Sequence, residues 1–259
     1  YGARMTSAAG GKLTMTNVDF DGQSQDGLVL SKDMNLQVTG TLQNAGYCGM
    51  KILSASNGDW DFTGLSIDGN GIGVNHAGSG TLRLVDTTMG ATNGADVDMS
   101  GTATVHFLEG TIDDAKVTAS DSSKLTRLRE LDVAITKSEG GAVSDDSPVK
   151  ILNADNRVIA SGLTSGGTGE VSDMEFVTWT VDKTGKTSEN LAGYQLVTVA
   201  KVAYVSNSVA DFRYALNQIT LVDAPGNTAS AALSLRVDAK TCYSYTTTSY
   251  NYLQNCSGL

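Results

Sequence analysis

Apolar residues in the first half of the chain recur in short strand-like segments. Many of these residues lie two positions apart, as Trp60 and Phe62 do, and this spacing places both side chains on one face of a strand. The segments are LTMTNVDFDG (13–22), LQVTGTLQNA (36–45), WDFTGLSIDG (60–69), LRLVDTTMGA (82–91), VHFLEGTIDD (105–114) and LTRLRELDVA (125–134). Their first residues are 23, 24, 22, 23 and 20 positions apart. The chain therefore contains an internal structural repeat.

Each repeat contains three short strands. A polar or glycine turn divides each segment into two strands, and the typical turn residues are Asn17, Gly40, Gly64 and Asp86. A third strand is expected between successive segments, in 27–35, 49–59, 73–81, 97–104 and 117–124. Three strands in about 22 residues predict a right-handed parallel β-helix of about six coils, in which each coil hydrogen-bonds to the next. A leucine-rich repeat needs a Leu and Asn frame that is missing here, and a propeller blade needs about 40 residues.

Polar residues align after the second strand of several repeats. The column contains Asp21, Asn44, Asp68 and Asp113, and Gly90 interrupts it. Such side chains cap backbone amides at corners, which favours a ladder of turns. A bound calcium ion is the alternative interpretation, although the tandem GGxGxD motif of calcium-binding β-helices is absent.

The second half of the chain has a different pattern. The stretch SEGGAVSDDSP (138–148) breaks the repeat and indicates a linker. Alternating apolar and polar residues then predict an antiparallel β-sandwich with strands in 149–155, 157–164, 170–185, 194–206 and 217–224. Asp155–Asn156 suits a hairpin turn, and SGGTGE suits a loop. The all-β chain is thus expected to divide into a β-helix (1–142), a sandwich (143–225) and a C-terminal strand and tail (226–259).

Two family resemblances follow from these residues. The stretch ILNADNRVIASGLTSGGTGEV (151–171), with YQLVTV (194–199) as a later strand, resembles the carboxypeptidase-regulatory-like and related immunoglobulin-like modules of secreted proteins. The repeats of the first half are similar to right-handed parallel β-helix repeat proteins of archaeal and bacterial cell surfaces. These resemblances imply a fold and an extracellular location, and such modules often act as spacers or adhesive units.

The C-terminal tail is polar and aromatic. Cys242 and Cys256 bracket the segment TCYSYTTTSYNYLQNC and are expected to form a disulfide, which favours an oxidising, extracellular location. Cys48 is expected to be a small buried residue. The tail also contains the expected assembly contacts, Tyr243, Tyr245, Tyr250 and Tyr252. Its strand either packs on its own sandwich or pairs with the next subunit.

Charge narrows the range of partners. Lys and Arg number 18 against 28 Asp and Glu, giving a net charge of −10, so nucleic acid would be repelled over most of the surface. No apolar run approaches the length of a membrane span. The expected location is therefore extracellular or on the cell surface.

The sequence contains no catalytic motif such as GxSxG, HExxH, a P-loop or GxGxxG. Its two histidines, His76 and His106, are expected on the surface. The enzyme alternative comes from the fold, because polysaccharide lyases and glycosidases use long β-helices and need clustered carboxylates. The candidates for such a cluster are Asp59, Asp61, Arg83, Asp113 and Asp114.

Fold analogy alone does not establish function, and the sequence favours a protein that is not an enzyme. We expect a structural or adhesive extracellular protein, a self-assembling subunit of a filament, sheath or surface layer. A β-helix has unpaired strand edges at both ends, so the expected partners are other copies of the chain. The alternative is a protein that binds or cleaves surface polysaccharide.

Overall fold

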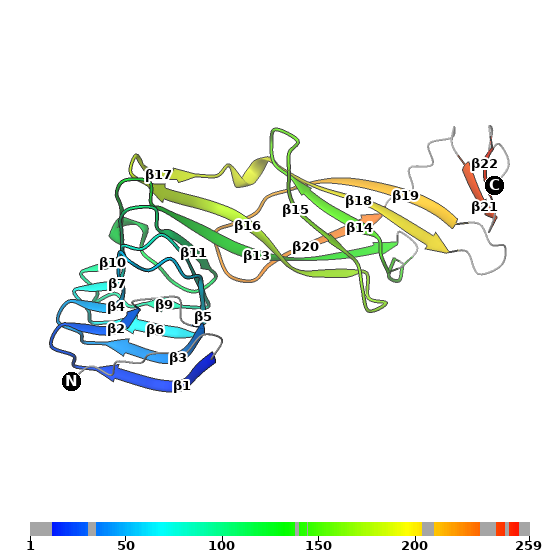
Figure 1. Ribbon diagram of the computed structural model, residues 1–259. Helices are drawn as coiled ribbons and strands as arrows, with labels where there is room; N and C mark the ends of the chain where they lie inside the picture. The colour runs from blue at the N-terminus through cyan, green and yellow to red at the C-terminus, as the bar shows by residue number, and fades with distance from the viewer. Residues whose placement is uncertain are drawn as a thin grey trace. The chain divides into compact units, whose positions relative to one another are not determined.

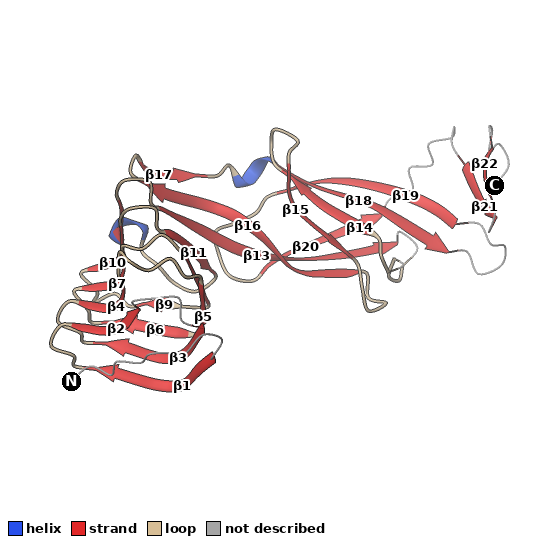
Figure 2. Cartoon of the chain, viewed as in Figure 1, coloured by secondary structure: helices blue, strands red, loops and turns tan. Residues whose placement is uncertain are grey.

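A computed structural model shows an all-β protein, with 61% of residues in strands and 3% in helices (Figures 1 and 2). The structure describes residues 12–30, 35–137, 140–143, 145–203, 210–233, 242–246 and 249–253. Side chains are described for 14–30, 36–137, 140–143, 145–198 and 218–231. The chain divides into two compact units, 1–129 with 177–189 and 130–176 with 190–259.

The first unit is a parallel β-solenoid of about 5 turns, which confirms the predicted β-helix. Three sheets run along the stack of coils, and the strands of successive coils pair in parallel within each of them (Figure 1). Sheet A contains β1 (Lys12–Asp21), β3 (Asn35–Gln43), β6 (Leu65–Asp68) and β9 (Thr88–Met89). Sheet B contains β2 (Asp26–Leu30), β4 (Cys48–Ile52), β7 (Ile72–His76), β10 (Ala95–Met99) and β12 (Val117–Ala119). Sheet C contains β5 (Trp60–Thr63), β8 (Thr81–Val85), β11 (Thr104–Leu108), β13 (Lys124–Lys137), β16 (Glu170–Asp182) and β17 (Gly185–Ser188), with β20 (Asn227–Leu233) beside β13.

The predicted stacking of repeats is observed residue by residue in four of its five steps. The pairs are Leu13 with Leu36, Trp60 with Leu82, Leu82 with Val105, and Val105 with Leu125. Inward-facing residues of successive coils form one continuous apolar core, in which Phe62, Leu84 and Phe107 are fully buried. The apolar spacing therefore determined the register, because a shift of one residue would turn this face to solvent.

The predicted turn residues lie at one corner of the coil and share an unusual backbone. Their φ angles are positive: 52° for Asn17, 127° for Gly40, 70° for Gly64 and 49° for Asp86. Glycine, Asn and Asp tolerate this left-handed region best. The fifth residue in the column is Glu109 (φ 51°), which is less suited to it.

The sixth predicted coil does not close, and this explains the difference between about six coils and about 5. Strand β13 pairs in register with β11 from Lys124 to Leu128. The position that follows Leu128, where a turn would be expected, is occupied by Arg129, which is less suited to a positive φ than Gly, Asn or Asp. The strand therefore continues to Lys137, and its residues from Glu130 onward belong to the second unit.

The second unit contains an antiparallel sheet, as predicted. Sheet D consists of β15 (Val158–Leu163), β14 (Pro148–Leu152), β18 (Tyr194–Ala203) and β19 (Ala210–Ile219), in that order. The core of the unit combines this sheet with the distal half of β13, the proximal half of β16 and β20. Strand β20 pairs with β13 in parallel, from Leu131 with Asn227 to Lys137 with Leu233. The unit is therefore not purely antiparallel, because β13 and β20 run in the same direction.

Two boundaries differ from the sequence prediction. The segment 138–148 was expected to be a linker, but Val143 is 3% exposed and packs in the core of the second unit. The strand expected in 217–224 ends earlier, at Ile219, and is followed by a loop in which Leu221 is buried. The Asp155–Asn156 hairpin is confirmed: Asn156 has φ 61°, and its N–H donates to the carbonyl of Asn153 over 2.9 Å.

Candidate functional site

The carboxylates Asp59 and Asp61 lie where the chain enters sheet C, on either side of buried Trp60. Asp59 accepts a hydrogen bond from the backbone N–H of Thr81, in the next coil, over 2.8 Å. Asp61 Oδ2 lies 3.9 Å from Arg83 Nε, with the Asp61 side chain 64% exposed. Both carboxylates thus have local structural partners within the coil stack.

The second pair of carboxylates lies two coils further along the solenoid, at a short 3-10 helix (Asp114–Lys116). Asp113 caps this helix by accepting a hydrogen bond from the N–H of Ala115 over 3.0 Å. Asp114 forms an ion pair with Lys186 of β17 at 2.7 Å. The helix leads into sheet B, whereas Asp59 and Asp61 lie on sheet C, so the structure does not join the two pairs into a catalytic cluster.

The expectation of two surface histidines is wrong for His76. Its side chain is fully buried, because position 76 falls on the inward-facing side of β7. Nδ1 accepts a hydrogen bond from the N–H of Gly78 (3.2 Å), and Nε2 donates to the carbonyl of Gly80 (3.0 Å). Burial lowers the pKa of His76 below its ordinary value, so the ring is neutral and stabilises a turn. His106 is partly exposed on sheet C, and in the strand register it lies beside Arg83 of the preceding coil.

The polar column after the second strand forms the predicted ladder of turns. Asn44 donates from Nδ2 to Asp21 (2.8 Å), and Asp68 accepts hydrogen bonds from the N–H and hydroxyl of Thr92. Hydrogen bonding by the Thr92 hydroxyl lowers the pKa of Asp68. Gly90 interrupts the column because a Cβ there would lie 2.0 Å from the Asp68 carboxylate. Within the described ranges, no group of three or more His, Cys, Asp or Glu is arranged to hold a metal ion.

A buried asparagine ladder was missed at the sequence level. Asn70 and Asn93 are 2% and 3% exposed. The Asn70 side chain accepts a hydrogen bond from the N–H of Ala45 and donates one to the carbonyl of Leu42. The Asn93 side chain donates in the same way to the carbonyl of Ile67 over 2.8 Å. Asn93 Oδ1 also accepts from the N–H of Asn70. The signal in the sequence was the Asn-Gly dipeptide repeated at 70–71 and 93–94, one coil apart.

A small charged group lies on sheet B around β2 and β4. Lys51 Nζ is 3.0 Å from Asp26 Oδ2 and 5.2 Å from the centroid of the Tyr47 ring, which is 49% exposed. Cys48, beside Asp26 in the register, is fully buried as predicted. Burial, with the nearby Asp26 carboxylate, raises the pKa of the Cys48 thiol to about 12. The thiol is therefore an inert core group and not a nucleophile.

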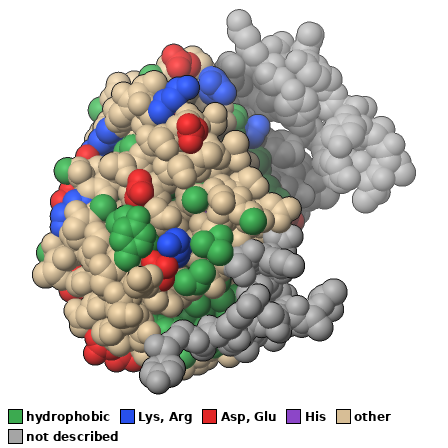
Figure 3. All heavy atoms as spheres, turned by 60° about the vertical axis from the view of Figure 1, so that its left-hand side comes forward, with side chains coloured by type: hydrophobic (Ala, Val, Ile, Leu, Met, Phe, Trp, Pro, Cys, Tyr) green, Lys and Arg blue, Asp and Glu red, His purple; other side chains and the backbone are tan. Residues whose placement is uncertain are grey.

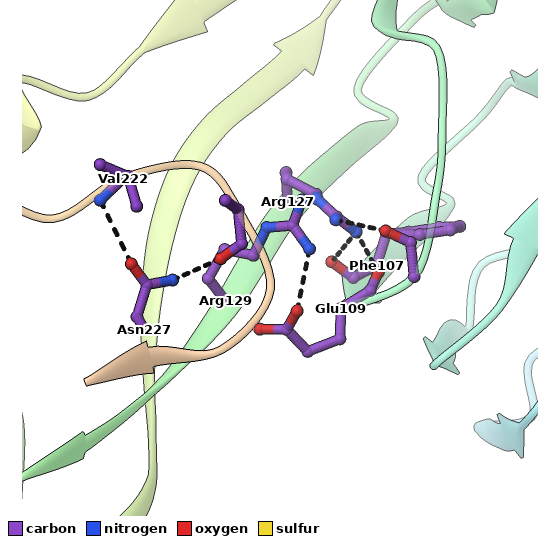
Figure 4. Close-up of polar contacts among 8 residues, drawn as sticks. Phe107, Glu109, Arg127, Arg129, Val222 and Asn227 are labelled. Atoms are coloured by element: carbon purple, nitrogen blue, oxygen red, sulfur yellow. Dashed lines mark hydrogen bonds and ion pairs between the residues drawn. The ribbon is translucent and has the colours of Figure 1, made fainter.

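Two buried arginines close the last corner of the solenoid (Figure 4). Arg127 is 2% exposed, occupies the inward position paired with Phe107, and has its guanidinium 4.9 Å from the centroid of that ring. It donates to the main-chain carbonyls of Phe107, Glu109 and Gly110. Arg129 donates to the Glu109 carboxylate over 2.9 Å. These charges satisfy the polar groups of the corner. Among the described residues, no further coil of the solenoid follows β13.

The opposite end of the solenoid has an incompletely covered core. Among the described residues, no strand pairs with the outer edge of β1 or β2. Met15, Val18 and Phe20 of β1 are only partly buried against the core. In the next coil, Val38 and Leu42, which pair with Met15 and Phe20, are fully buried. The apolar side chains of the first coil are thus less completely buried than their counterparts in the next coil. Figure 3 shows hydrophobic side chains among charged ones in the lower half of the view.

The four tyrosines that are expected to make assembly contacts lie in a hairpin of β21 (Cys242–Thr246) and β22 (Ser249–Leu253). Its register pairs Tyr243 with Tyr252 and Tyr245 with Tyr250. Cys242 pairs with Leu253 in the same hairpin, and Cys256, its expected disulfide partner, lies outside the described residues. Both the disulfide and the tyrosine contacts remain predictions.

Comparison with known proteins does not assign the chain to a family. A scan against protein-family models found no match, and searches of curated proteins and of solved structures found none either. In the part of the chain that the structure describes, no helix is long and apolar enough to cross a membrane.

Proposed function

We propose that this protein is an extracellular structural or adhesive protein that assembles with other copies of itself into a filament, sheath or surface layer. The observation that carries the proposal is the apolar, partly covered first coil. Phe20 remains partly buried while its counterpart Leu42, one coil further, is fully buried. Covering an apolar side chain of this size stabilises an association by up to about 1.5 to 3 kcal/mol.

The rigidity of the solenoid supports a scaffold role. Successive coils are joined by parallel main-chain hydrogen bonds, and the buried side chains of Asn70 and Asn93 donate hydrogen bonds to main-chain carbonyls at the corners. A contact between unlike ends is heterologous, and it produces an open filament when its rotation does not close a ring.

The extracellular location and the family kinship belong to the same proposal. They rest on the resemblance to surface β-helix proteins and to carboxypeptidase-regulatory-like modules, and on the expected Cys242–Cys256 disulfide. In support, β14 and β15 form an antiparallel hairpin in sheet D, and a Gly-rich loop follows β15 in the chain. The acidic surface favours solubility outside the cell.

The test uses light scattering and negative-stain electron microscopy of the full chain over a range of concentrations. We expect the wild-type chain to form ordered fibres or sheets, and Phe20→Lys to shorten or abolish them. Val29→Lys is the matched control, because Val29 lies in the same coil, 43% exposed on the outer face of β2. Tryptophan fluorescence shows whether each variant is folded. A wild-type chain that stays monomeric in every condition contradicts the proposal.

Polysaccharide binding or cleavage is the alternative outcome of this test. It would be supported by a monomer that binds acidic or neutral polysaccharide in a pull-down assay. The observed engagement of Asp59, Asp113 and Asp114 in local structural contacts gives this alternative less support.

A further inference from the structure

An asparagine followed by a glycine occurs three times in the solenoid, at Asn57–Gly58, Asn70–Gly71 and Asn93–Gly94. Such a pair can react within the chain, because the main-chain nitrogen of the glycine can attack the side-chain amide carbon of the asparagine. Glycine lacks a Cβ and so allows the chain to bend into the ring that this attack requires. The reaction also requires that the asparagine side chain can move and that water can reach it.

The buried asparagine ladder protects two of these three pairs. Asn70 and Asn93 are 2% and 3% exposed, and the Asn70 amide is held by two main-chain groups of the preceding coil. The Asn93 amide donates to the carbonyl of Ile67 and accepts from the N–H of Asn70. The N–H of Gly94, which would make the attack on Asn93, donates to the carbonyl of Asn70 over 2.9 Å. At both asparagines the reaction must therefore wait for local opening of the coil.

The side chain of Asn57, in contrast, is exposed. Asn57 lies in the segment 53–59 between β4 and β5, and residues 56–59 belong to no strand, helix or turn. The neighbouring residue makes the contact with the core: Ser56 is 1% exposed, and its carbonyl accepts a hydrogen bond from the N–H of Ser79 over 2.9 Å. The Asn57 amide thus meets water at a point where the main chain is not part of a regular element.

We propose that Asn57 is a modification site at which the folded chain deamidates without an enzyme. The main-chain nitrogen of Gly58 forms a bond to Cγ of Asn57, the bond from Cγ to Nδ2 breaks, and ammonia leaves with the proton of the Gly58 N–H. Water then opens the resulting succinimide ring at either carbonyl. The products at position 57 are aspartate, with the original main chain, and isoaspartate, in which the main chain runs through the former side chain.

The two products have different consequences for the coil. Both add one negative charge, two residues before Asp59, to a chain with a net charge of −10. Isoaspartate also adds one atom to the main chain before Gly58. The Gly58 carbonyl packs closely against Gly80 of the next coil, where a Cβ on Gly80 would lie 1.8 Å from it. We therefore expect isoaspartate, and not aspartate, to weaken this contact between coils.

The test incubates the full chain at pH 8 and follows the three asparagines by peptide mapping with mass spectrometry. Trypsin cleaves after Lys51 and Arg83, so one peptide contains both Asn57 and Asn70, and its fragment ions compare them directly. We expect Asn57 to be converted at least about tenfold faster than Asn70 or Asn93, which react only after local opening. Asn57→Gln is the matched control, because its longer side chain would have to form a larger ring, and it should remove the more acidic form seen in isoelectric focusing.

A parallel incubation in urea tests whether the fold causes this selectivity. In urea we expect Asn70 and Asn93 to react as fast as Asn57. Equal conversion of Asn57 and Asn70 in the folded chain overturns the proposal, and so does a preference for Asn57 that is just as large in urea. The reaction takes place within one chain, so its outcome is independent of the proposed assembly.

Discussion

The ion pair between Glu109 and Arg129 offers a sharp test of how the solenoid ends. Arg129 Nη1 lies 2.9 Å from Glu109 Oε2, and the two side chains are only 8% and 9% exposed. At this separation the direct attraction is about 6 kcal/mol for an effective dielectric constant of about 20, and desolvation of both groups offsets much of it. Removing one partner leaves the other charge buried, so we expect Arg129→Met to lower the free energy of unfolding by about 3 to 5 kcal/mol.

A double-mutant cycle isolates this coupling. Glu109→Gln keeps the length of the side chain at a residue with positive φ, and the double variant Glu109→Gln/Arg129→Met removes both charges. We expect a coupling free energy of about 2 to 3 kcal/mol. The control cycle uses Asp61 and Arg83, which are 3.9 Å apart with Asp61 largely exposed, and should give about 0 to 1 kcal/mol.

The assay follows tryptophan fluorescence during urea unfolding. Trp60 and Trp179 are the only tryptophans of the chain, and both lie in the core of the first unit. Their signal therefore reports the unit that contains Glu109 and Arg129. A coupling below about 1 kcal/mol, no larger than that of the exposed pair, would refute the conclusion that the last corner depends on buried charge.

Three further predictions concern the buried polar groups of the solenoid. Burial lowers the pKa of His76 in the folded chain, so below about pH 6.5 the unfolded chain binds a proton that the folded chain does not. The free energy of unfolding should therefore decrease as the pH is lowered. Urea midpoints at pH 7.5 and 5.5 should show a smaller decrease in His76→Gln than in the wild type. Asn93→Leu leaves the Ile67 carbonyl and the Asn70 N–H without partners and should cost about 3 kcal/mol in the same assay, whereas Asn75→Leu on the outer face should cost less than about 1 kcal/mol. Cys48 should resist iodoacetamide at pH 8 in the folded chain and react in urea, with labelling read by mass spectrometry; equal labelling in both conditions would contradict its burial and its pKa of about 12.

The end-to-end contact is a proposal from the fold, and the residues proposed for it could not be found from the sequence. Phe20 and Leu42 occupy equivalent positions in the repeat, so their local patterns look alike. They differ only because one lies at the end of the stack and the other inside it. Similarly, only the strand order makes β15 an edge strand of sheet D.

The sequence by itself determined the local rules of this protein. A strand period of two determined the register of Trp60 with Leu82, and the need for positive φ determined the turns at Asn17 and Asp86. These features depend on neighbouring residues and on one repeat spacing, both of which are visible in the chain.

Only the tertiary structure decided where the coil repeat ends and which distant strands pair. Strand β13 begins as a coil strand and continues into the second unit, where β20, almost a hundred residues later in the chain, pairs with it in parallel. How completely His76 and Arg127 are buried also depends on what lies above and below them in the stack. Burial and long-range pairing are properties of the whole assembly of strands, since distant residues provide the surfaces that exclude water.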